Sequence, residues 1–191
     1  MRGNDHMIVN VATAMGVGAT LLLMNKSSSL SAHNISRSIV GFLFNHDFSI
    51  INDTFTMIFV VAASALLYLF GSLLPDIDHP YSTLGRVIHI PIKHRTWTHA
   101  IYPAIVFILL GLKWRLVLWL GLGYLGHLIA DSFSASGVNW LYPMKNKFHK
   151  IKLYHTSDIS EYLTAGIWFG LNFVYTIIAV LIAFKIIHFQ A

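Results

Sequence analysis

Cysteine is absent from the 191-residue chain, and charged residues are few. The first absence excludes disulfides, a cysteine nucleophile and thiolate ligands, so any bound metal must be held by imidazole and carboxylate groups. Charged residues make up 11% of the sequence and hydrophobic residues 55%, with a mean hydropathy of +0.63. This composition lies outside the range of soluble domains and predicts an integral membrane protein. No basic run interleaved with aromatic residues occurs, so we expect no nucleic-acid partner.

Five apolar stretches are candidates for crossing a bilayer. They are residues 7–24, 55–74, 97–112, 116–133 and 163–189. The sequence therefore predicts a single all-α domain over residues 1–191, a polytopic membrane helix bundle of about five transmembrane helices. The connection 25–54 contains apolar residues that could lie flat at the membrane interface. A signal peptide is the less favoured explanation of the first stretch, because its apolar run is long for one.

Five crossings would place the N-terminus and the loops 75–96 and 134–160 on one side of the membrane. Basic residues are more numerous on this side, which predicts that it is cytoplasmic and that the protein is a multi-pass plasma-membrane protein. The basic residues on it are Arg2, Arg86, Lys93, Arg95, Lys145, Lys147, Lys150 and Lys152, against Lys26, Arg37, Lys113, Arg115 and Lys185 opposite. Most acidic residues also fall on this side, a bias that solubility alone does not explain.

Two carboxylates, Asp76 and Asp78, directly follow the second stretch. Pro75 and Pro80 flank them and prevent the helix from continuing. An extended backbone would direct both carboxylates to the same side. Because an isolated Asp-x-Asp often only marks a membrane boundary, the motif gains its weight from the other polar residues predicted at the same level.

His127 and Asp131 stand four residues apart within the fourth stretch, on one face of a predicted helix. Ionisable groups in an apolar span are costly and normally face a protein interior, a partner or a wet cavity. A structural hydrogen bond between the two side chains is one explanation. The favoured explanation is that both side chains bind one metal ion.

His94, Arg95 and His99 surround the start of the third stretch, where Thr96 or Thr98 is predicted to cap the helix. His99 would project from the first turn. The free N–H groups of a helix N-terminus favour an anion, so we expect His94 and Arg95 to bind phosphate. The alternative is that they contact lipid headgroups and only mark the interface.

Four further candidates, His6, Glu161, Lys145 and Lys147, complete the predicted site. His6 precedes the first stretch and Glu161 the fifth, and each on its own would be read as a surface residue. Their shared level with the other ligands favours both as metal ligands, His6 more than Glu161. Lys145 and Lys147 lie in the basic loop of the same side and are expected to recruit an anionic headgroup. Mixed histidine and aspartate ligands suit zinc or manganese better than calcium, and magnesium would be expected to use fewer imidazoles.

Several motifs occur as a linked set: Pro-Asp-Ile-Asp-His-Pro at 75–80, Ser82 with Gly85, His94-Arg95 with Thr98-His99, Gly123-Tyr124-x-x-His127-x-x-x-Asp131, and Leu141-x-Pro143. Together they resemble the YdjM-type inner-membrane proteins, a family described as LexA-regulated metal-dependent hydrolases. The resemblance covers about residues 6–148. It implies a bacterial inner-membrane hydrolase whose polar positions match His6, Asp76, Asp78, His99, His127 and Asp131. The family commonly has glycine where this chain has Thr96. The His-x-x-x-Asp motif is also similar to part of the zinc-dependent phospholipase C pattern, whose companion His-x-x-x-Glu is missing here.

The sequence thus predicts a membrane-embedded metal-dependent hydrolase, with its metal site at one membrane face. It would cleave a phosphoester of a phospholipid or lipid-linked phosphate by metal-activated water. Two or three divalent ions are expected, zinc first, with manganese or magnesium as alternatives. The expected ligands are His6, Asp76, Asp78, His99, His127, Asp131 and Glu161, of which Asp78, His99 and Asp131 are also expected to be catalytic. The alternatives are a metal-binding or ion-translocating membrane protein without hydrolytic activity, and a structural membrane protein. The one-sided distribution of polar residues disfavours translocation.

Overall fold

The computed structural model describes residues 3–27, 29–44, 54–88, 90–156 and 158–184, and gives only the backbone of 3–6 and 54–58. This part of the chain contains helices and no named strand, which confirms the predicted all-α class. The elements are α1 (Gly3–Lys26), α2 (Leu30–Phe44), α3 (Thr54–Leu73), the 3-10 helices η1 (Leu74–Asp78) and η2 (Trp97–His99), α4 (Tyr102–Lys113), α5 (Arg115–Ser132) and α6 (Ile159–Ala183).

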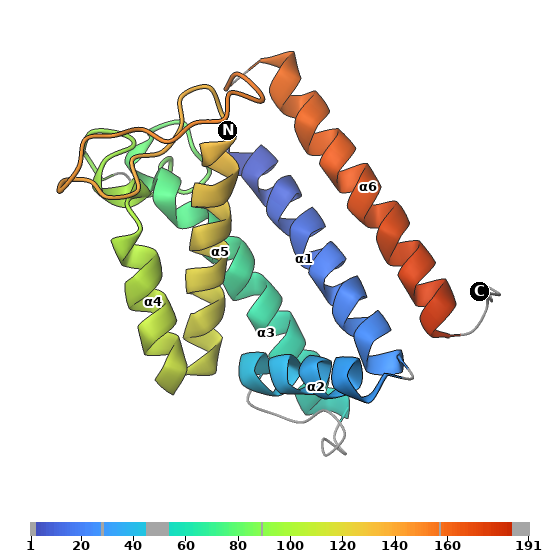
Figure 1. The fold of residues 1–191 in the computed structure, drawn as a ribbon. Coiled ribbons are helices and arrows are strands. Elements are labelled where there is room, and N and C mark those ends of the chain that lie inside the picture. Colours follow the sequence, from blue (N-terminus) through green and yellow to red (C-terminus); the bar gives the residue numbers. More distant parts are fainter. Residues whose placement is uncertain (1–2, 28, 45–53, 89, 157, 185–191) are drawn as a thin grey trace.

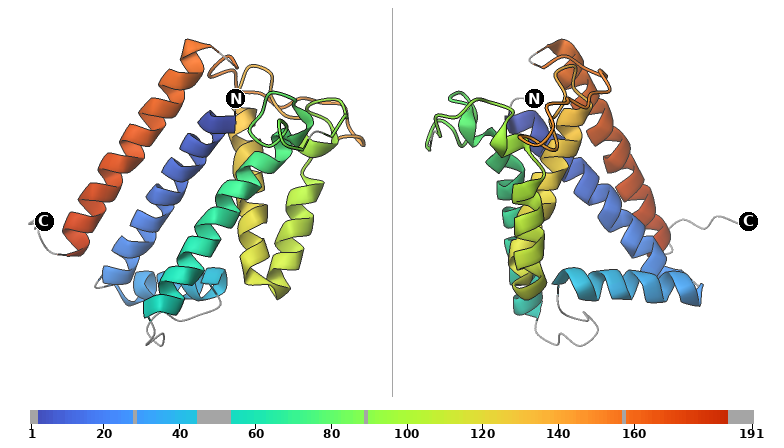
Figure 2. Two further views of the ribbon diagram at one scale, coloured as in Figure 1. Left: turned by 180° about the vertical axis from the view of Figure 1, so that it is seen from behind. Right: turned by 60° about the vertical axis from the view of Figure 1, so that its left-hand side comes forward.

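The long helices run up and down along one another, so that five helix ends meet at one end of the molecule (Figure 1). Helices α3 and α5 finish there, and α1, α4 and α6 begin there; the views in Figure 2 show the same arrangement. The sequence-based expectation that these ends share one side is therefore met by the fold. We call this end of the bundle the site end.

Three helical segments in the described part of the chain are long and apolar enough to cross a membrane by themselves. They are Met7–Lys26, Phe59–Asp78 and Ile159–Ala183. Helices α4 and α5 form a shorter hairpin that packs on α3 through α5. The 12 residues of α4 rise about 18 Å, which is less than the ~30 Å of a hydrocarbon core. The five predicted spans thus correspond to α1, α3, α4, α5 and α6, with α4 shorter than expected.

The third predicted span begins later than the sequence suggested. Residues Trp97–His99 form a 3-10 turn, and α4 starts only at Tyr102, with a proline in its first positions. A helix starting at Trp97 would place Pro103 in its interior, where the ring clashes with the carbonyl of the residue four positions earlier. Thr96 and Thr98 consequently do not cap a helix, and their hydroxyls are used elsewhere.

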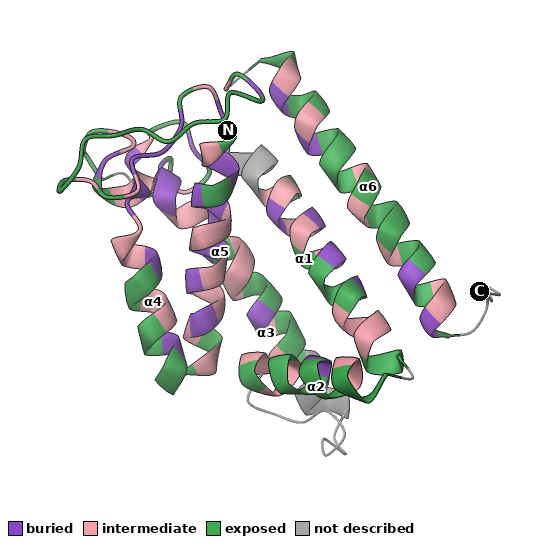
Figure 3. Cartoon of the chain, in the orientation of Figure 1, coloured by how far each residue is buried: buried purple, intermediate pink, exposed green. Residues whose placement is uncertain are grey.

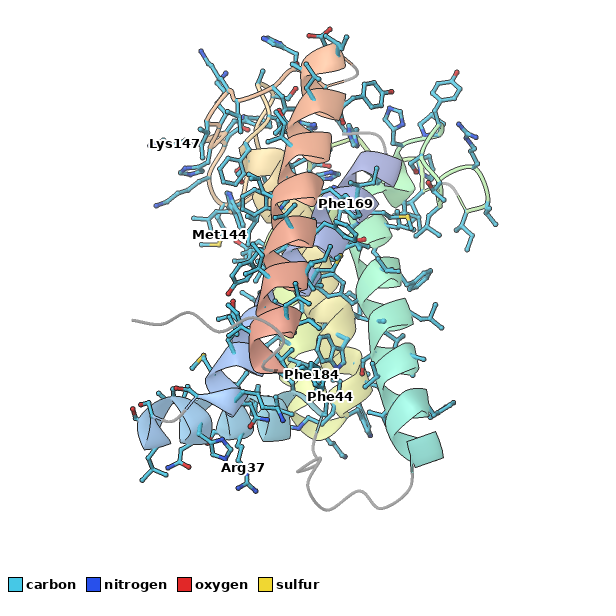
Figure 4. All side chains as sticks on the ribbon, turned by 90° about the vertical axis from the view of Figure 1, so that its right-hand side faces the viewer. Arg37, Phe44, Met144, Lys147, Phe169 and Phe184 are labelled. Carbon is cyan, nitrogen blue, oxygen red and sulfur yellow. The ribbon has the colours of Figure 1, made fainter. Side chains whose placement is uncertain are left out.

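Helix α2 lies across the opposite end of the bundle, crosswise to the other helices (Figure 2). Ile35, Ile39 and Phe42 are exposed along one of its sides, whereas Ser36 is buried against the bundle. Arg37 points away from the bundle, as Figure 4 shows. An apolar stripe beside a polar face is the pattern of a helix in the plane of the membrane interface, as expected for the 25–54 connection.

Glycines bring α3 and α5 into close contact. A β-carbon built on Gly123 of α5 would lie 1.9 Å from the backbone oxygen of Tyr68 on α3, so only glycine allows this approach. Gly126 similarly accommodates Asn10 of α1, whose side-chain oxygen accepts a hydrogen bond from the Tyr68 hydroxyl at 3.0 Å. Small residues at helix contacts are the usual means of close packing in membranes. Gly123 and Gly126 thereby set the depth of His127, which follows Gly126 along α5.

Helix α6 packs on α1 through a polar seam. The indole N–H of Trp168 donates to the Thr13 hydroxyl at 3.1 Å, and the hydroxyls of Thr20 and Tyr175 lie 3.0 Å apart. Both pairs are separated by 155 residues, as in a parallel pair of helices in constant register. Figure 3 shows that most of the remaining α6 surface is exposed, whereas buried residues gather in α5 and next to its C-terminal end.

Candidate metal centre

Two histidines and two aspartates meet at the site end. The Nε2 atom of His99 lies 3.5 Å from Asp76 Oδ1 and 3.5 Å from Asp131 Oδ2. The Nε2 atom of His127 lies 3.6 Å from the same oxygen of Asp76 and 3.8 Å from that of Asp131. All four residues are buried, and they come from η1, η2 and α5. Residues distant in sequence thus direct four donor atoms toward one another.

The spacing of these atoms fits a small divalent cation. Ligands held about 2.1 Å from a tetrahedral metal lie about 3.4 Å from one another, close to the four His–Asp distances of 3.5–3.8 Å. The ligand atoms of Asp76, His99 and His127 all lie within 4.8 Å of one another. Within the described residues, His99 Nε2 is fully buried and has no hydrogen-bond partner. A buried polar nitrogen without a partner is costly and calls for an explanation. A metal ion between the four side chains would supply one.

A backbone carbonyl sets the orientation of His127. Its Nδ1 atom lies 2.7 Å from the carbonyl oxygen of Ser72, and because a carbonyl can only accept, Nδ1 must carry the proton. The lone pair of His127 is then on Nε2, the atom that faces Asp76 and Asp131. Histidines that bind metals are commonly oriented by such a hydrogen bond from the other ring nitrogen.

A second group adjoins the first through the other edge of the His99 ring. Asp78, His94 and His99 form a separate grouping with metal-ligand spacing. The Thr98 hydroxyl donates to Asp78 Oδ2 at 2.5 Å and lies 3.1 Å from His99 Nδ1. His94 Nδ1 lies 2.8 Å from Asp78 Oδ1, a hydrogen-bond distance. This group could hold an ion of its own, and Asp78 is also linked through the Thr98 hydroxyl to the ring of His99.

His94 is the more accessible member of this second group, since its side chain is 34% exposed. Its ring lies 4.8 Å from that of His99 and 4.9 Å from that of His79, measured between ring centres. The pKa of His79 is lowered mainly by its partial burial and secondly by the positive charge that His94 can carry nearby. His94 thus links the buried centre to the molecular surface, a position compatible with its predicted contact to substrate.

Arg95 points into the protein beside Asp131. Its guanidinium donates to the carbonyl oxygen of Gly137 at 2.9 Å and lies 3.5 Å from both carboxylate oxygens of Asp131. The side chain is only 12% exposed, and the backbone has a positive φ of 63°. This left-handed conformation, rare outside glycine, turns the chain so that Arg95 points inward. These contacts suit a residue that orients Asp131. Phosphate binding by Arg95 remains a prediction.

Matching turns hold two of the aspartates. The Ser82 hydroxyl donates to the carbonyl oxygen of Asp76 at 2.6 Å and accepts from the N–H of Gly85 at 2.9 Å. The Ser134 hydroxyl does the same between the Asp131 carbonyl, at 2.7 Å, and the N–H of Gly137, at 3.0 Å. Each Ser-x-x-Gly turn fixes the backbone that carries one aspartate.

Glu161 is fully buried in the first turn of α6. The parallel α1–α6 seam keeps an offset of 155 residues through its two hydrogen-bonded pairs. Continuing this register by seven residues toward the site end brings Glu161 beside position 6 of α1. The side chain of His6 lies outside the described residues, so its ligation and that of Glu161 remain predictions. The structure nevertheless brings both positions to the site end.

Lys145 and Lys147 are exposed residues of the connection between α5 and α6. Their exposure sets them apart from the buried groups described above. Figure 4 shows Lys147 at the periphery of the site end. Contact between these lysines and a substrate therefore remains a prediction.

Comparison with known families agrees with this picture. The family model described as YdjM inner membrane protein matches residues 10–190. The chain belongs to this family. It is similar to the inner membrane protein YdjM of Escherichia coli (strain K12) and to that of Shigella flexneri, each 38% identical over 40% of this chain and 47% of the relative. The chain thus spans about half the length of the curated relatives it matches. No solved structure matches it.

Membership in the YdjM family and the apolar helices identify a multi-pass inner-membrane protein. Three contributions to the candidate site were not predicted from the sequence: those of Ser72, of Asn10 and of the second Ser-x-x-Gly turn. Ser72 acts through its backbone carbonyl, for which side-chain patterns give no signal. The repeat of Ser-x-x-Gly after two aspartates was visible in the sequence and could have indicated that Asp76 and Asp131 have equivalent surroundings.

Proposed function

We propose that this protein is a membrane-embedded, metal-dependent hydrolase whose centre is formed by Asp76, His99, His127 and Asp131. The observation that carries the metal site is the buried His99 Nε2, which faces two carboxylates at 3.5 Å and has no hydrogen-bond partner among the described residues. Zinc is the expected ion because a donor set of two imidazoles and two carboxylates suits it.

Electrostatics supports the same proposal. Asp76, Asp78 and Asp131 are all buried near one another, and Arg95 lies 3.5 Å from Asp131. Buried carboxylates close together repel one another and are costly without compensating positive charge. A divalent cation would supply that charge, and metal binding should therefore stabilise the folded protein.

The hydrolytic step is assigned from the chemistry of the donor set. When bound, a divalent metal would lower the pKa of a water molecule and stabilise negative charge on phosphate oxygens. His99 and His127 would present their Nε2 atoms to the metal, and Arg95 would hold Asp131 in place. His94 is partly exposed beside the buried group, which supports a substrate that comes from the headgroup layer. A phospholipid or lipid-linked phosphoester is therefore the proposed substrate.

Metal analysis joined to an activity assay tests this function. Detergent-purified protein should contain close to stoichiometric zinc, manganese or magnesium by elemental analysis. It should also release phosphate or a headgroup from a member of a panel of phospholipids and lipid-linked phosphates, and a chelator should abolish the release. Metal-loaded protein without turnover on a broad panel would favour the metal-binding or ion-translocating alternative. Protein without bound metal would refute the site itself.

A further inference from the structure

The surface of the site end is rich in positive charge. Between Asp78 and Asp158 the sequence has a single acidic residue, Asp131, and that residue is buried. Exposed lysines concentrate in residues 141–153, which we call the 141–153 loop. They are Lys145, Lys147, Lys150 and Lys152. This loop therefore presents four cations with no acidic side chain in the neighbouring sequence to neutralise them.

The same loop exposes large apolar side chains. Met144 is 77% exposed, Ile151 62% and Leu153 59%, and Leu141 and Phe148 are also exposed. Clustered exposed apolar residues in a soluble loop are unfavourable and commonly mark an interaction surface. Apolar and cationic residues alternate closely along this loop, a composition suited to the boundary between acyl chains and phosphate headgroups.

Hydrogen bonds hold the backbone of the loop against α5, so its exposed side chains keep a defined position on the surface. The N–H of Ile151 donates to the carbonyl of Ser132 at 2.9 Å, and that of Leu153 to Phe133 at 2.8 Å. At its end, buried Tyr154 donates its hydroxyl to the carbonyl of Ala130 at 2.7 Å. These bonds join the loop to the last turn of α5, which carries Asp131.

Aromatic residues indicate the level of the loop in the membrane. Trp97 and Tyr142 contact each other edge to face, with ring centres 5.7 Å apart, and the Tyr102 hydroxyl lies 3.0 Å from the sulfur of Met144. Tryptophan and tyrosine are enriched where hydrocarbon meets headgroups. Figure 4 shows Met144 nearer the middle of the bundle and Lys147 nearer the site end, an order that matches a passage from acyl chains to headgroups.

We propose that the 141–153 loop lies in the headgroup layer and binds anionic phospholipid. Its lysines would contact lipid phosphates, and Met144, Ile151 and Leu153 would lie among the upper acyl chains. An acidic protein or nucleic acid could pair with the lysines but would leave these apolar side chains in water. The proposal concerns lipid binding and holds whether or not the centre is hydrolytic. Combined with the proposed function, it defines the substrate class as an anionic lipid.

A local fluorescence assay tests lipid binding at the loop. Because the chain has no cysteine, Met144→Cys gives a single site for a bimane dye. The labelled protein is reconstituted in phosphatidylcholine vesicles that contain brominated phosphatidylglycerol or brominated phosphatidylcholine as quencher. We expect stronger quenching by the anionic lipid. The quenching gives the binding constant of the anionic lipid at this site relative to phosphatidylcholine. In the variant Lys145→Gln/Lys147→Gln/Lys150→Gln this relative constant should fall at least about tenfold, since each lysine near an anionic surface contributes roughly fivefold.

A charge-matched control separates local binding from a general effect of charge. Lys26→Gln/Arg37→Gln/Lys113→Gln removes three exposed cations from the opposite end and should preserve the preference at position 144. Equal loss in both triple variants, or an unchanged preference in the loop variant, would overturn the proposal. Absence of quenching by either lipid would overturn it too, by placing the loop in water. Metal content measured on the same samples should stay constant, which distinguishes failure here from failure of the metal centre.

Discussion

The guanidinium of Arg95 lies 3.5 Å from both carboxylate oxygens of Asp131, in a side chain that the protein largely buries. Asp131 in turn faces the Nε2 atoms of His99 and His127. Arg95 therefore acts on the centre through Asp131. Its neighbour His94, although adjacent in sequence, pairs with Asp78 on the other side of the His99 ring.

Replacing Arg95 should weaken metal binding. Arg95→Ala would leave the Asp131 carboxylate without its partner, and we expect a 10- to 100-fold loss in metal affinity, as is typical when groups supporting a ligand are removed. Arg95→Lys should recover part of the affinity by restoring the charge without the two-pronged geometry. Titration with a metal indicator measures both, with exposed Arg86→Ala as the control. Unchanged metal affinity together with reduced activity would instead support Arg95 as a phosphate-binding residue.

Replacing a residue of the centre should have a larger effect than replacing a supporting one. Asp131→Asn or His127→Ala is expected to lower metal affinity and any metal-dependent activity by at least about 100-fold, since even supporting groups contribute 10- to 100-fold. Membrane insertion should be preserved, because it depends on the apolar helices. His149→Ala, an exposed histidine of the 141–153 loop, is the matched control. Full metal content in the Asp131 and His127 variants would show that these residues do not bind the ion.

The close contact of α3 and α5 should be sensitive to a single methyl group. Gly123→Ala would place a β-carbon 1.9 Å from the Tyr68 backbone oxygen, so the helices must separate. We expect a loss of roughly 1–3 kcal/mol in stability and weaker metal binding, because His127 would move relative to the Ser72 carbonyl. Gly166→Ala on α6 meets no atom within 4 Å and should be neutral or slightly stabilising. Thermal unfolding in detergent, followed by circular dichroism, compares the two.

Much of the architecture was predictable because lipid imposes simple rules on sequence. Apolar runs located α1, α3, α4, α5 and α6, and ionisable residues at their ends indicated Asp76, His99, His127 and Asp131 as a converging group. Three features were not predictable. The late start of α4 follows from Pro103, whose effect on the preceding turn depends on the exact register. The inward direction of Arg95 depends on its positive φ, which residue type does not indicate. The Ser72 carbonyl contributes through the backbone alone.

Helix ends at the site end should be accessible from a single side of the membrane. Single cysteines at Arg86 and Lys147, both exposed at the site end, should react alike with an impermeant maleimide, whereas a cysteine at Arg37 on α2 should show the opposite accessibility. We expect the site end to be cytoplasmic, so Arg37→Cys alone should label on spheroplasts with intact membranes. His46, another position suited to this comparison, lies outside the described residues. Equal labelling of all three cysteines would contradict the shared orientation of the helix ends.

The register of the α1–α6 seam predicts which residues meet on the site-end side of its two hydrogen-bonded pairs. Thr13 pairs with Trp168 and Thr20 with Tyr175, so one further heptad places His6 beside Glu161. The double variant His6→Cys/Glu161→Cys should therefore cross-link on mild oxidation, as should Thr13→Cys/Trp168→Cys. Ile8→Cys/Glu161→Cys is the control, because Ile8 is 40% exposed on another side of α1.

The same register gives Glu161 a measurable role. A carboxylate fully buried beside position 6 suits either direct ligation or orientation of a ligand. Glu161→Gln keeps its size but removes its charge, and we expect it to lower metal affinity at least tenfold while the seam stays intact by cross-linking at Thr13 and Trp168. If the His6 and Glu161 cysteines cross-link but Glu161→Gln binds metal normally, then Glu161 is a structural residue of the seam and the centre is confined to η1, η2 and α5.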